Sequence, residues 1–565
     1  MFTTYILYNE DREYNDFKIY EEGCDEEVAL DIIPFKFKLF NLDTFITSPG
    51  IKIINSIIRH MTTIPGVLIL SAKKTYGVYK DKLLYQCIPD DNRLPTFLVP
   101  YKLKSDFKKQ YVNKYVTFRY ETWCNKHPSG RLTNVLGDVS NLETFYEYQL
   151  YCKSLNYSIQ NFTRVTANKL KEKTEQEFIS LILERNPKIR DYRENTNIFC
   201  IDPIGSADFD DALSITKTDE TGYKIAVYIA NVPLWMEVLQ LWDSFSDRIS
   251  TIYLPDRRRT MLPTSLSECL CSLVEGHTRF SFVCELSVKN NIINDVSFYN
   301  AAITIHKNFR YEESGLLQYK NYSDLFKATK LLNEKYKYMS NVRNSHDVVA
   351  YLMISMNYYC AKEMVKRKTG IFRSAIIRDV ATIPEDLPKD ISKFIKIWNS
   401  NGGQYILYSP EISHDILELE SYIHITSPIR RLVDLLNMIR IQLDLDLIEF
   451  GNSAKSFLNN WIDKLDYINT TMRAIKKIQS DCSLLNICLT DTSVLDKEYE
   501  GYVFDRIESN DGFFKYVVYL PELKLVSRLK TQDDMSNYGS YKFNLYVFND
   551  EDRLKKKIRI QKIKV

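Results

Sequence analysis

Four aspartates lie within ten positions of one another in the segment Ile198–Leu213. The segment reads IFCIDPIGSADFDDAL and places them at Asp202, Asp208, Asp210 and Asp211. Carboxylates this close repel one another, and burial would raise their pKa unless a cation neutralised them. Short oxygen-bearing side chains suit Mg²⁺, which keeps some of its waters and accepts substrate phosphate as a further ligand. Phosphodiester hydrolysis uses such a site, with one ion activating water and a second, about 4 Å away, stabilising the leaving oxygen.

Other interpretations compete with a metal site. An aspartate-rich stretch is commonly a solvated turn, but apolar runs flank this one on both sides, which favours a buried loop. An EF-hand loop starting at Asp208 would have Ala212 at its fifth position and Leu213 at its glycine position, so that motif fails. A structural network of salt bridges is the alternative that the local chemistry leaves open.

Breaks in the sequence indicate how the chain would position the cluster. An apolar strand runs up to Asp202, and Pro203 and Gly205 interrupt it, so we expect the chain to fold back on itself there. Asp208 and Asp210 would share one face if that part of the chain is extended. The fold-back should therefore gather the carboxylates at one end of a sheet.

The 565 residues are too many for one ordinary core and predict a multidomain α+β protein. Short alternating runs with turn signals predict an OB-type β-barrel region of one or two barrels in residues 1–150. We expect a helical connector in residues 151–195, a mixed α/β catalytic domain in residues 196–490 and a C-terminal OB-type β-barrel in residues 491–565.

The overall composition is that of a globular protein without an evident membrane segment. The formal net charge is only +2, so binding of a polyanion would have to come from local patches. Eleven cysteines without a CxxC pair favour reduced thiols in a cytoplasmic setting. The start lacks the pattern of a signal peptide, and no apolar run approaches the roughly 20 residues needed to span a bilayer.

Several motifs resemble those of the RNase II (RNB) family. IDPIGSADFDDAL is similar to the family's acidic motif, with all four aspartates at matching spacing. Three more motifs follow in the family's order: STIYLPDRRRTMLPTSLSECLCSL (Ser250–Leu273), FRYEE (Phe309–Glu313) and HITSPIRRLVDL (His424–Leu435). The preceding barrel is resembled at Trp123, Pro128, Gly130 and LGDV (Leu136–Val139), in a version closer to the eukaryotic exosome-type and ribonuclease R-like enzymes. The resemblance runs over roughly residues 66–490.

The resemblance implies a fold, an activity and a cofactor. It implies a catalytic domain with a buried channel fed by OB-type barrels, of which residues 1–150 would be a cold-shock-like RNA-binding region. It also implies hydrolysis of single-stranded RNA from its 3′ end to nucleoside 5′-monophosphates. By motif, Asp202, Asp208, Asp210 and Asp211 would hold Mg²⁺, for which Mn²⁺ can substitute, and handle water. Loss of Asp210 is expected to abolish the chemistry.

The resemblance also assigns roles to Arg430, Tyr311 and Tyr253. Arg430 matches an arginine that stabilises phosphate at the scissile bond, Tyr311 a tyrosine of the catalytic centre, and Tyr253 an aromatic that stacks on the 3′-terminal base. Independently, Ser427-Pro428 reads as a helix N-cap and first helical residue, which would put Arg430 in a first turn whose N–H groups favour phosphate. An arginine that caps a neighbouring carbonyl is the alternative. Arg431, about 100° further round such a helix, should point elsewhere.

The residues around Tyr253 leave two questions open. Tyr253 precedes Leu254-Pro255, so its backbone should be extended, but a lone tyrosine is more often a core residue than a stacking platform. Arg257–Arg259 would either contact RNA phosphates or be solvated.

The chain departs from the family pattern outside the aspartates. Tyr228 and Asn231 stand where the family usually has His and Asp, Leu432 replaces a tyrosine, and Met438-Ile439 replace a His-Arg pair. None of these is a metal ligand, so they bear on rate and RNA path. They support an alternative, a catalytically silent RNA-binding or scaffold protein on the same fold. A DNA exonuclease is a third interpretation.

The sequence does not identify the physiological RNA. It also leaves open whether the chain works alone or with a partner such as an RNA helicase or an exosome-like ring. The abundance of Ile, Lys, Asn and Tyr is typical of an AT-rich genome, such as that of a large DNA virus, in which case the host cytoplasm or the virion would be its location.

Overall fold

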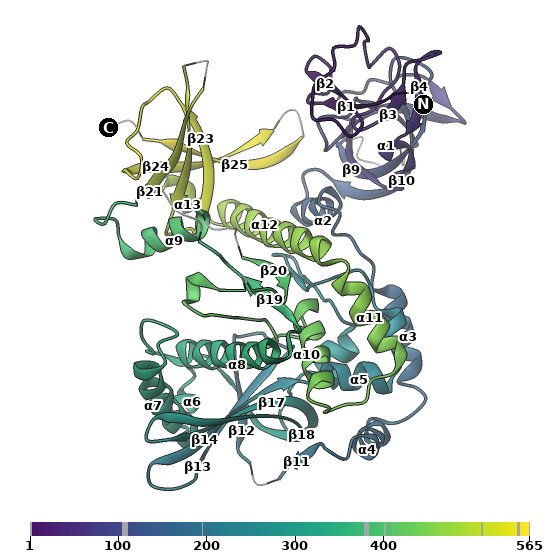
Figure 1. Cartoon of the computed structure of the whole chain (residues 1–565). Helices are drawn as coiled ribbons and strands as arrows, with labels where there is room; N and C mark the ends of the chain where they lie inside the picture. The colour runs from purple at the N-terminus through teal and green to yellow at the C-terminus, as the bar shows by residue number, and fades with distance from the viewer. Residues whose placement is uncertain are drawn as a thin grey trace. The chain divides into compact units, whose positions relative to one another are not determined.

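The computed structural model describes residues 3–103, 111–194, 196–377, 383–399, 403–410, 412–509, 512–550 and 554–563. The chain divides into two compact units (Figure 1). One comprises Met1–Asn156, Leu254–Asp256 and Lys477–Val565, and the other comprises Tyr157–Tyr253 and Arg257–Lys476.

Two sheets form the N-terminal part. The first has the order β2-β1-β3-β4, and the second has the order β5-β9-β10-β8-β7-β6 with β5 also paired to β7. That extra pairing closes five strands into a barrel of the OB type. The elements are β1 (Thr4–Asn9), β2 (Phe17–Glu21), β3 (Thr44–Ile46), β4 (Lys52–Asn55), α1 (Ile57–His60), β5 (Ile64–Leu68), β6 (Val78–Tyr79), β7 (Lys82–Pro89), β8 (Phe97–Tyr101), β9 (Lys114–Thr122), β10 (Ser129–Asp138) and α2 (Leu142–Cys152).

Alternation along the barrel strands explains this core. In β7, Tyr85 and Cys87 are buried while their neighbours are half-exposed, as a strand with one face inward requires. Gly130 in β10 is needed for close packing, because a Cβ there would lie 2.6 Å from Cδ2 of Phe118. The first sheet contributes to the same apolar cluster through residues such as Phe45. The sequence had left one or two barrels open, and the structure has one closed barrel beside a four-stranded sheet.

A second barrel-like sheet forms the C-terminal part, as the sequence predicted. Its order is β23-β22-β21-β24-β25, and the two edge strands contact each other. Tyr499, Tyr516 and Phe543 are buried in its core. The elements are α12 (Leu465–Thr490), α13 (Ser493–Asp496), β21 (Tyr499–Glu508), β22 (Phe514–Leu520), β23 (Leu525–Thr531), β24 (Ser540–Asp550) and β25 (Lys555–Lys562).

The other unit is built on a six-stranded sheet of order β11-β18-β12-β13-β14-β17. The long strand β18 pairs antiparallel with β17 and, further along, parallel with β12. Because β17 is the last strand in the order, this extra pairing closes the sheet on itself. Ile198–Ile201 in β12 are all buried, as expected of a continuous apolar strand covered on both faces. The strands are β11 (Arg190–Tyr192), β12 (Ile198–Asp202), β13 (Asp211–Lys217), β14 (Gly222–Ala230), β17 (Thr278–Lys289) and β18 (Ile292–Arg310).

Helices α7 and α8 pack with this sheet around one large apolar cluster (Figure 1). The apolar residues of α8, such as Leu352 and Met356, meet those of β13 and β14 in that cluster. The remaining elements of the unit are α3 (Gln160–Lys169), α4 (Glu175–Arg185), α5 (Val232–Val238), η1 (Trp242–Ser244), β15 (Ile252–Tyr253), β16 (Arg258–Arg259), η2 (Ser265–Leu270), α6 (Ser314–Gln318), α7 (Lys320–Lys335), α8 (Ser345–Arg367), β19 (Ile371–Ser374), α9 (Lys389–Asn399), β20 (Gln404–Leu407), η3 (Asp415–Leu417), α10 (Leu432–Asp444) and α11 (Asn452–Ile462).

Candidate active site

The loop between β12 and β13 carries the four aspartates. β12 ends at Asp202, and β13 begins at Asp211 and runs back antiparallel beside it. Gly205 makes the reversal with a φ of 84°, a backbone conformation that favours glycine. Ala230 N–H donates to the backbone oxygen of Asp210 at 2.8 Å and fixes the end of the loop. The fold-back expected from the sequence is therefore present.

Asp210 and Arg430, 220 positions apart in the chain, form the centre of the site. Asp210 is 2% exposed, and its carboxylate accepts from the Ile429 backbone N–H at 2.9 Å and from Arg430 Nε at 3.0 Å. Burial raises the pKa of Asp210 to about 7, although Arg430 and the Ile429 N–H oppose the shift. The Arg430 side chain is 41% exposed, so it can reach a ligand while it holds Asp210.

The helix that the sequence placed at Ser427-Pro428 begins later, so that prediction was wrong. α10 starts at Leu432, and Ser427 to Arg430 form a turn in which Arg430 N–H donates to Ser427 O at 3.2 Å. Thr251 N–H donates to Arg430 O, and Leu432 N–H donates to Ile249 O. This strand-like pairing holds the backbone at residue 431 extended, with φ −138° and ψ 125°, and delays the helix.

Arg431 points away from the acidic loop, as expected, although the reason differs from the predicted helical rotation. Its guanidinium donates to Asp434 at 2.8 Å, and Asp434 also accepts from the Ser427 backbone N–H at 2.8 Å. Asp434 is fully buried in the first turn of α10. Two adjacent arginines therefore serve different carboxylates.

A short hairpin brings two side chains to Asp208. β15 and β16 pair antiparallel with Tyr253 opposite Arg258. Arg258 forms ion pairs with Asp208 at 2.6 Å and with Glu268 at 2.7 Å, and the Tyr253 hydroxyl lies 3.4 Å from Asp208. Tyr253 has the extended backbone that the sequence predicted, and its side chain is exposed. Burial of its hydroxyl, together with Asp208, raises the pKa of Tyr253 to about 12.

The role of Arg258 was not among the alternatives drawn from the sequence. For Arg257–Arg259 we had expected RNA contact or solvation, whereas Arg258 is a partner of the acidic loop. Three consecutive arginines carry no signal that singles out the middle one, since the register of the hairpin decides which of them faces the loop.

Tyr311 reaches the site from the end of β18. Its backbone N–H donates to Asp202 O at 3.1 Å, and its ring stacks on the ring of His346, with centroids 3.5 Å apart and an angle of 11° between the planes. Burial, followed by the charges of Asp211 and Asp202, raises the pKa of Tyr311. The sequence did not indicate His346, because a single histidine near the start of a helix has no distinguishing pattern.

Asp202 and Asp211 lack the cationic partners that Asp208 and Asp210 have. Within the described part of the chain neither forms an ion pair, and Oδ2 of Asp202 is buried without a hydrogen-bond partner. Burial, followed by repulsion from Asp211 and Asp210, raises the pKa of Asp202 to about 8. Burial raises the pKa of Asp211 to about 6, although Arg430 opposes the shift.

These carboxylates fit a hard divalent cation in their donor chemistry. A bound cation would give the buried oxygen a partner and would lower the raised pKa values of the carboxyl groups. As the residues lie, however, no three His, Cys, Asp or Glu side chains of the described ranges form a group ready to hold a metal ion. Asp208 and Asp210 are each turned toward an arginine instead.

The departures from the family motifs lie in the protein interior. Tyr228 is buried and shares a 3.0 Å hydrogen bond with Ser214, while Asn231 donates to Asn300 and Gln442 at 2.9 Å each. Two further sets of replacements are fully buried apolar residues of α10: Leu432 and Met438-Ile439. No hydrogen bond or ion pair links any of these side chains to the four aspartates among the contacts of the described residues.

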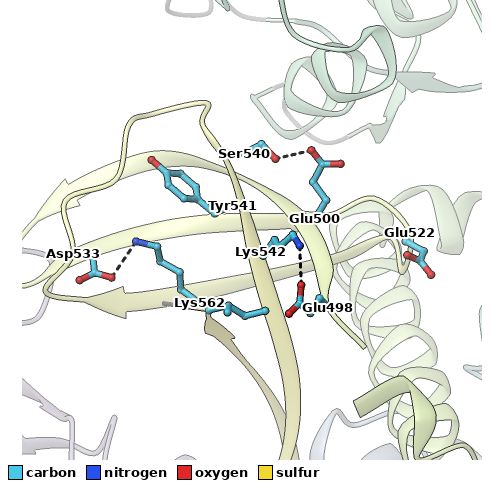
Figure 2. A pocket seen from close by; sticks show the side chains of 9 residues that line it. Glu498, Glu500, Glu522, Asp533, Ser540, Tyr541, Lys542 and Lys562 are labelled. Carbon is cyan, nitrogen blue, oxygen red and sulfur yellow. Dashed lines mark hydrogen bonds and ion pairs between the residues drawn. The ribbon is translucent and has the colours of Figure 1, made fainter. Parts of the chain in front are cut away.

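A large cavity of about 1100 Å³ lies elsewhere, in the C-terminal barrel (Figure 2). Its lining contains none of the predicted site residues: Glu498, Glu500, Glu522, Asp533, Ser540, Tyr541, Lys542, Lys562 and Ile563. This large cavity is therefore not the site of the four aspartates. No helix in the described ranges is both long and apolar enough to cross a membrane.

Two protein-family models match the chain. Residues 189–345 match the RNB domain, and residues 84–148 match the Dis3-like cold-shock domain 2 (CSD2). The first match includes the acidic loop, Tyr253 and Tyr311 and ends before Arg430. Ribonuclease R of Buchnera aphidicola is 28% identical over 330 residues, which are 46% of this chain and 46% of that protein. The chain spans less than half the length of such curated relatives.

Solved structures with the same fold cover nearly the whole chain. The apo form of Mycoplasma genitalium RNase R has a TM-score of 0.70 at 16% identity, over 98% of this chain and 99% of that one. Yeast Ssd1, a pseudonuclease, has a TM-score of 0.59 at 14% identity, over 96% of this chain and 80% of that one. These likenesses and the CSD2 match confirm the α+β multidomain fold with OB-type barrels.

Proposed function

We propose, from the match of residues 189–345 to the RNB domain, that the chain is a member of the RNase II (RNB) family and a hydrolytic 3′-to-5′ exoribonuclease that acts on single-stranded RNA and releases nucleoside 5′-monophosphates. The observation that carries the proposal is the Asp210–Arg430 pair, which joins a loop of four aspartates to a half-exposed arginine side chain. Metal-assisted phosphodiester hydrolysis uses carboxylates that hold a metal ion and a positively charged side chain that binds the phosphate.

Arg430 has the geometry of a phosphate-binding residue. Only its Nε is used by Asp210, and its other N–H groups make no hydrogen bond to any described residue. A guanidinium held at one edge can offer its outer N–H groups to a phosphate as a bidentate pair. In the proposed reaction Arg430 binds the scissile phosphate, and Asp210 holds the Arg430 guanidinium in position.

The two tyrosines would position the RNA end. Tyr253 is exposed next to Asp208, which suits a ring that stacks on the 3′-terminal base. Tyr311 is held by Asp202 through its backbone and by His346 through its ring. Its hydroxyl would orient the phosphate near the carboxylates.

We propose that Mg²⁺, or Mn²⁺ in its place, is held first by Asp202 and Asp211, the carboxylates without a cationic partner. When bound, the ion would supply an activated water and positive charge for the phosphate. The two-ion arrangement implied by the family resemblance further requires Arg258 to leave Asp208. Asp210 would then contribute while it remains paired with Arg430.

A 5′-labelled single-stranded oligoribonucleotide tests the activity. With Mg²⁺ present, the label should appear in progressively shorter products, and a DNA strand of the same sequence should resist. Asp210→Asn should bind the RNA without shortening it, because it removes one carboxylate charge and leaves the rest of the protein in place. An intact labelled strand across protein and metal titrations contradicts the activity, and unchanged turnover of Asp210→Asn contradicts the site.

A second candidate is a catalytically silent RNA-binding or scaffold protein on this fold. The specific observation in its favour is that Arg258 already neutralises Asp208, since a salt bridge of 2.6 Å competes with a metal ion for the same oxygens. RNA binding without metal-dependent turnover would select this candidate. The unpartnered Asp202 oxygen favours the enzyme, because a silent protein has no use for an uncompensated buried carboxylate.

A further inference from the structure

The residue that follows Tyr311 has an unusual backbone conformation. Glu312 lies two residues beyond the end of β18, and its φ is 55°, in the left-handed region that side chains other than glycine rarely adopt. Such a conformation is strained and persists only where surrounding contacts hold it. The contacts that hold Glu312 therefore also bear on the place of the Tyr311 side chain next to it.

Three hydrogen bonds tie Glu312 to Ser345, the first residue of α8. The Glu312 carboxylate accepts from the Ser345 backbone N–H at 2.7 Å and from the Ser345 hydroxyl at 2.5 Å. The Glu312 backbone N–H donates to the Ser345 hydroxyl oxygen at 3.2 Å. Ser345 is fully buried. Because the bonds from Ser345 favour the charged carboxylate, they lower the pKa of Glu312, which is therefore an ionised acceptor at neutral pH.

Helix α8 gives this contact a rigid support. Its N-cap is Asn344, whose side chain accepts from the Asp347 backbone N–H at 2.9 Å. Its apolar residues belong to the large cluster that α8 shares with the sheet (Figure 1). The first N–H groups of a helix have no partner within the helix, so a carboxylate that accepts from one of them satisfies it. Glu312 thus joins the end of β18 to the start of a helix that is anchored in the core.

The contact between Glu312 and Ser345 adjoins the contacts of Tyr311. The Tyr311 ring stacks on the ring of His346 with centroids 3.5 Å apart, and the Tyr311 backbone N–H donates to Asp202 O at 3.1 Å. Two consecutive residues after β18 therefore meet two consecutive residues of α8. Since the backbone is held on both sides of the ring, the directions in which the Tyr311 side chain can point are restricted.

We propose that Glu312 is a positioning residue, which together with Ser345 fixes the Tyr311 hydroxyl beside the carboxylates of the acidic loop. The catalytic part of this inference rests on the proposed function. Burial, followed by the charges of Asp211 and Asp202, raises the pKa of Tyr311, so its hydroxyl keeps its proton and can donate to a phosphate. Such a donor has to be held to within about 0.5 Å. Among the described residues Glu312 makes no hydrogen bond to the four aspartates, so it acts through Tyr311.

Shortening of 5′-labelled single-stranded RNA by three variants tests the inference. Glu312→Gly removes the carboxylate but permits the left-handed backbone. It should lower kcat by roughly 10- to 100-fold, since a misplacement of about 1 Å can cost that much, and should leave KM nearly unchanged. Glu312→Gln keeps an acceptor oxygen and should restore most of the turnover. Asp347→Ala is the matched control, because Asp347 accepts from the Arg343 backbone N–H at 2.7 Å at the same helix start and forms no hydrogen bond with Tyr311 among the described contacts.

Thermal unfolding separates positioning from stability. Glu312→Gly and Asp347→Ala each remove a carboxylate that accepts from a backbone N–H at the start of α8, so their midpoints should fall by similar amounts. Only Glu312→Gly should lose turnover. A role in stability alone would give the two variants the same kcat.

A double-variant cycle with Tyr311→Phe shows whether Glu312 acts through the tyrosine hydroxyl. If it does, the two changes are not additive, and the protein with both Tyr311→Phe and Glu312→Gly turns over no more slowly than Tyr311→Phe alone. Losses that multiply would show that Glu312 acts independently of that hydroxyl and would overturn the inference. A Glu312→Gly protein with the kcat of the wild type would overturn it as well.

A fluorine label at position 311 makes the test independent of activity. The full chain with 3-fluorotyrosine in place of Tyr311 is observed by fluorine NMR without RNA or metal. Glu312→Gly should shift or broaden the resonance, and Asp347→Ala should leave it unchanged. A resonance that does not respond to Glu312→Gly overturns the inference, and the proposed function stands if the wild type shortens RNA. If the wild type does not shorten RNA but the resonance responds, the proposed function fails and the positioning of Tyr311 by Glu312 stands.

Discussion

Replacing Asp202 by Asn should stabilise the metal-free protein at high pH. Asp202 is the site carboxylate with the largest rise in pKa, to about 8, and its Oδ2 is buried without a partner. In the unfolded chain an aspartate ionises near pH 4. Between these two values the folded state holds a proton that the unfolded state has lost, so the wild type loses stability as pH rises.

The size of the effect follows from the shift. A pKa rise of about four units corresponds to a penalty on the order of 5 kcal/mol at pH 8, and the neutral asparagine avoids it. In a large domain this is a gain of several degrees in the thermal midpoint, at roughly 2 °C per kcal/mol. The difference should vanish below pH 4, grow between pH 4 and about 8, and stay constant above.

Thermal unfolding of wild type and Asp202→Asn in EDTA, from about pH 5 to pH 9, measures this difference, with scans at one heating rate. The same scans with Mg²⁺ in place of EDTA measure how a bound ion changes the thermal midpoint. Mg²⁺ should raise the midpoint of the wild type, more at pH 8 than at pH 6, and have little effect on the variant. An Asp202→Asn protein that is less stable than the wild type at pH 8 without metal would refute the argument that this carboxylate is an uncompensated buried charge.

Three further changes test other contacts. Arg258→Gln frees Asp208 and should strengthen Mn²⁺ binding, with a second ion bound per chain in a titration without RNA; unchanged binding would mean that the arginine does not compete with metal. His346→Ala removes a ring stacked at 3.5 Å and should lower RNA turnover by up to about tenfold, while His346→Phe restores it; equal turnover of the two variants would rule out a stacking role. Gly130→Ala forces a Cβ to within 2.6 Å of the Phe118 ring and should destabilise the barrel by roughly 1–3 kcal/mol in denaturant unfolding, and a neutral result would show that the ring can move.

Local chemistry allowed the sequence to predict the reversal of the chain at the acidic loop. Pro203 and Gly205 are the residues that interrupt a strand, and the structure turns there, with Gly205 at positive φ. The barrels at each end were also predicted, because alternation of apolar residues is a local property. That Asp210 meets Arg430 across 220 positions was available only through the family resemblance, since no local rule joins segments so distant.

The contacts that the sequence missed are set by tertiary pairing. The helix at Ser427-Pro428 satisfied every local rule for a helix start, but the backbone of residues 430 and 432 pairs with residues 251 and 249 and keeps the chain extended. Arg258 faces Asp208 because the hairpin register puts it opposite Tyr253. The start of α10 and the contact of Arg258 both depend on which segments lie side by side. Local patterns in a single sequence do not predict that pairing.

For the proposed activity, the cation that balances each carboxylate matters as well as the carboxylates themselves. In this chain Arg258 and Arg430 pair with Asp208 and Asp210, whereas Asp202 and Asp211 form no ion pair within the described residues and carry uncompensated negative charge once they ionise. One divalent ion balances two such charges, whereas a silent protein would leave them buried and uncompensated at a cost to folding. The pairing of Asp208 with Arg258 therefore argues against two resident ions in the free protein, and the repulsion between the buried carboxylates of Asp202 and Asp211 argues for one.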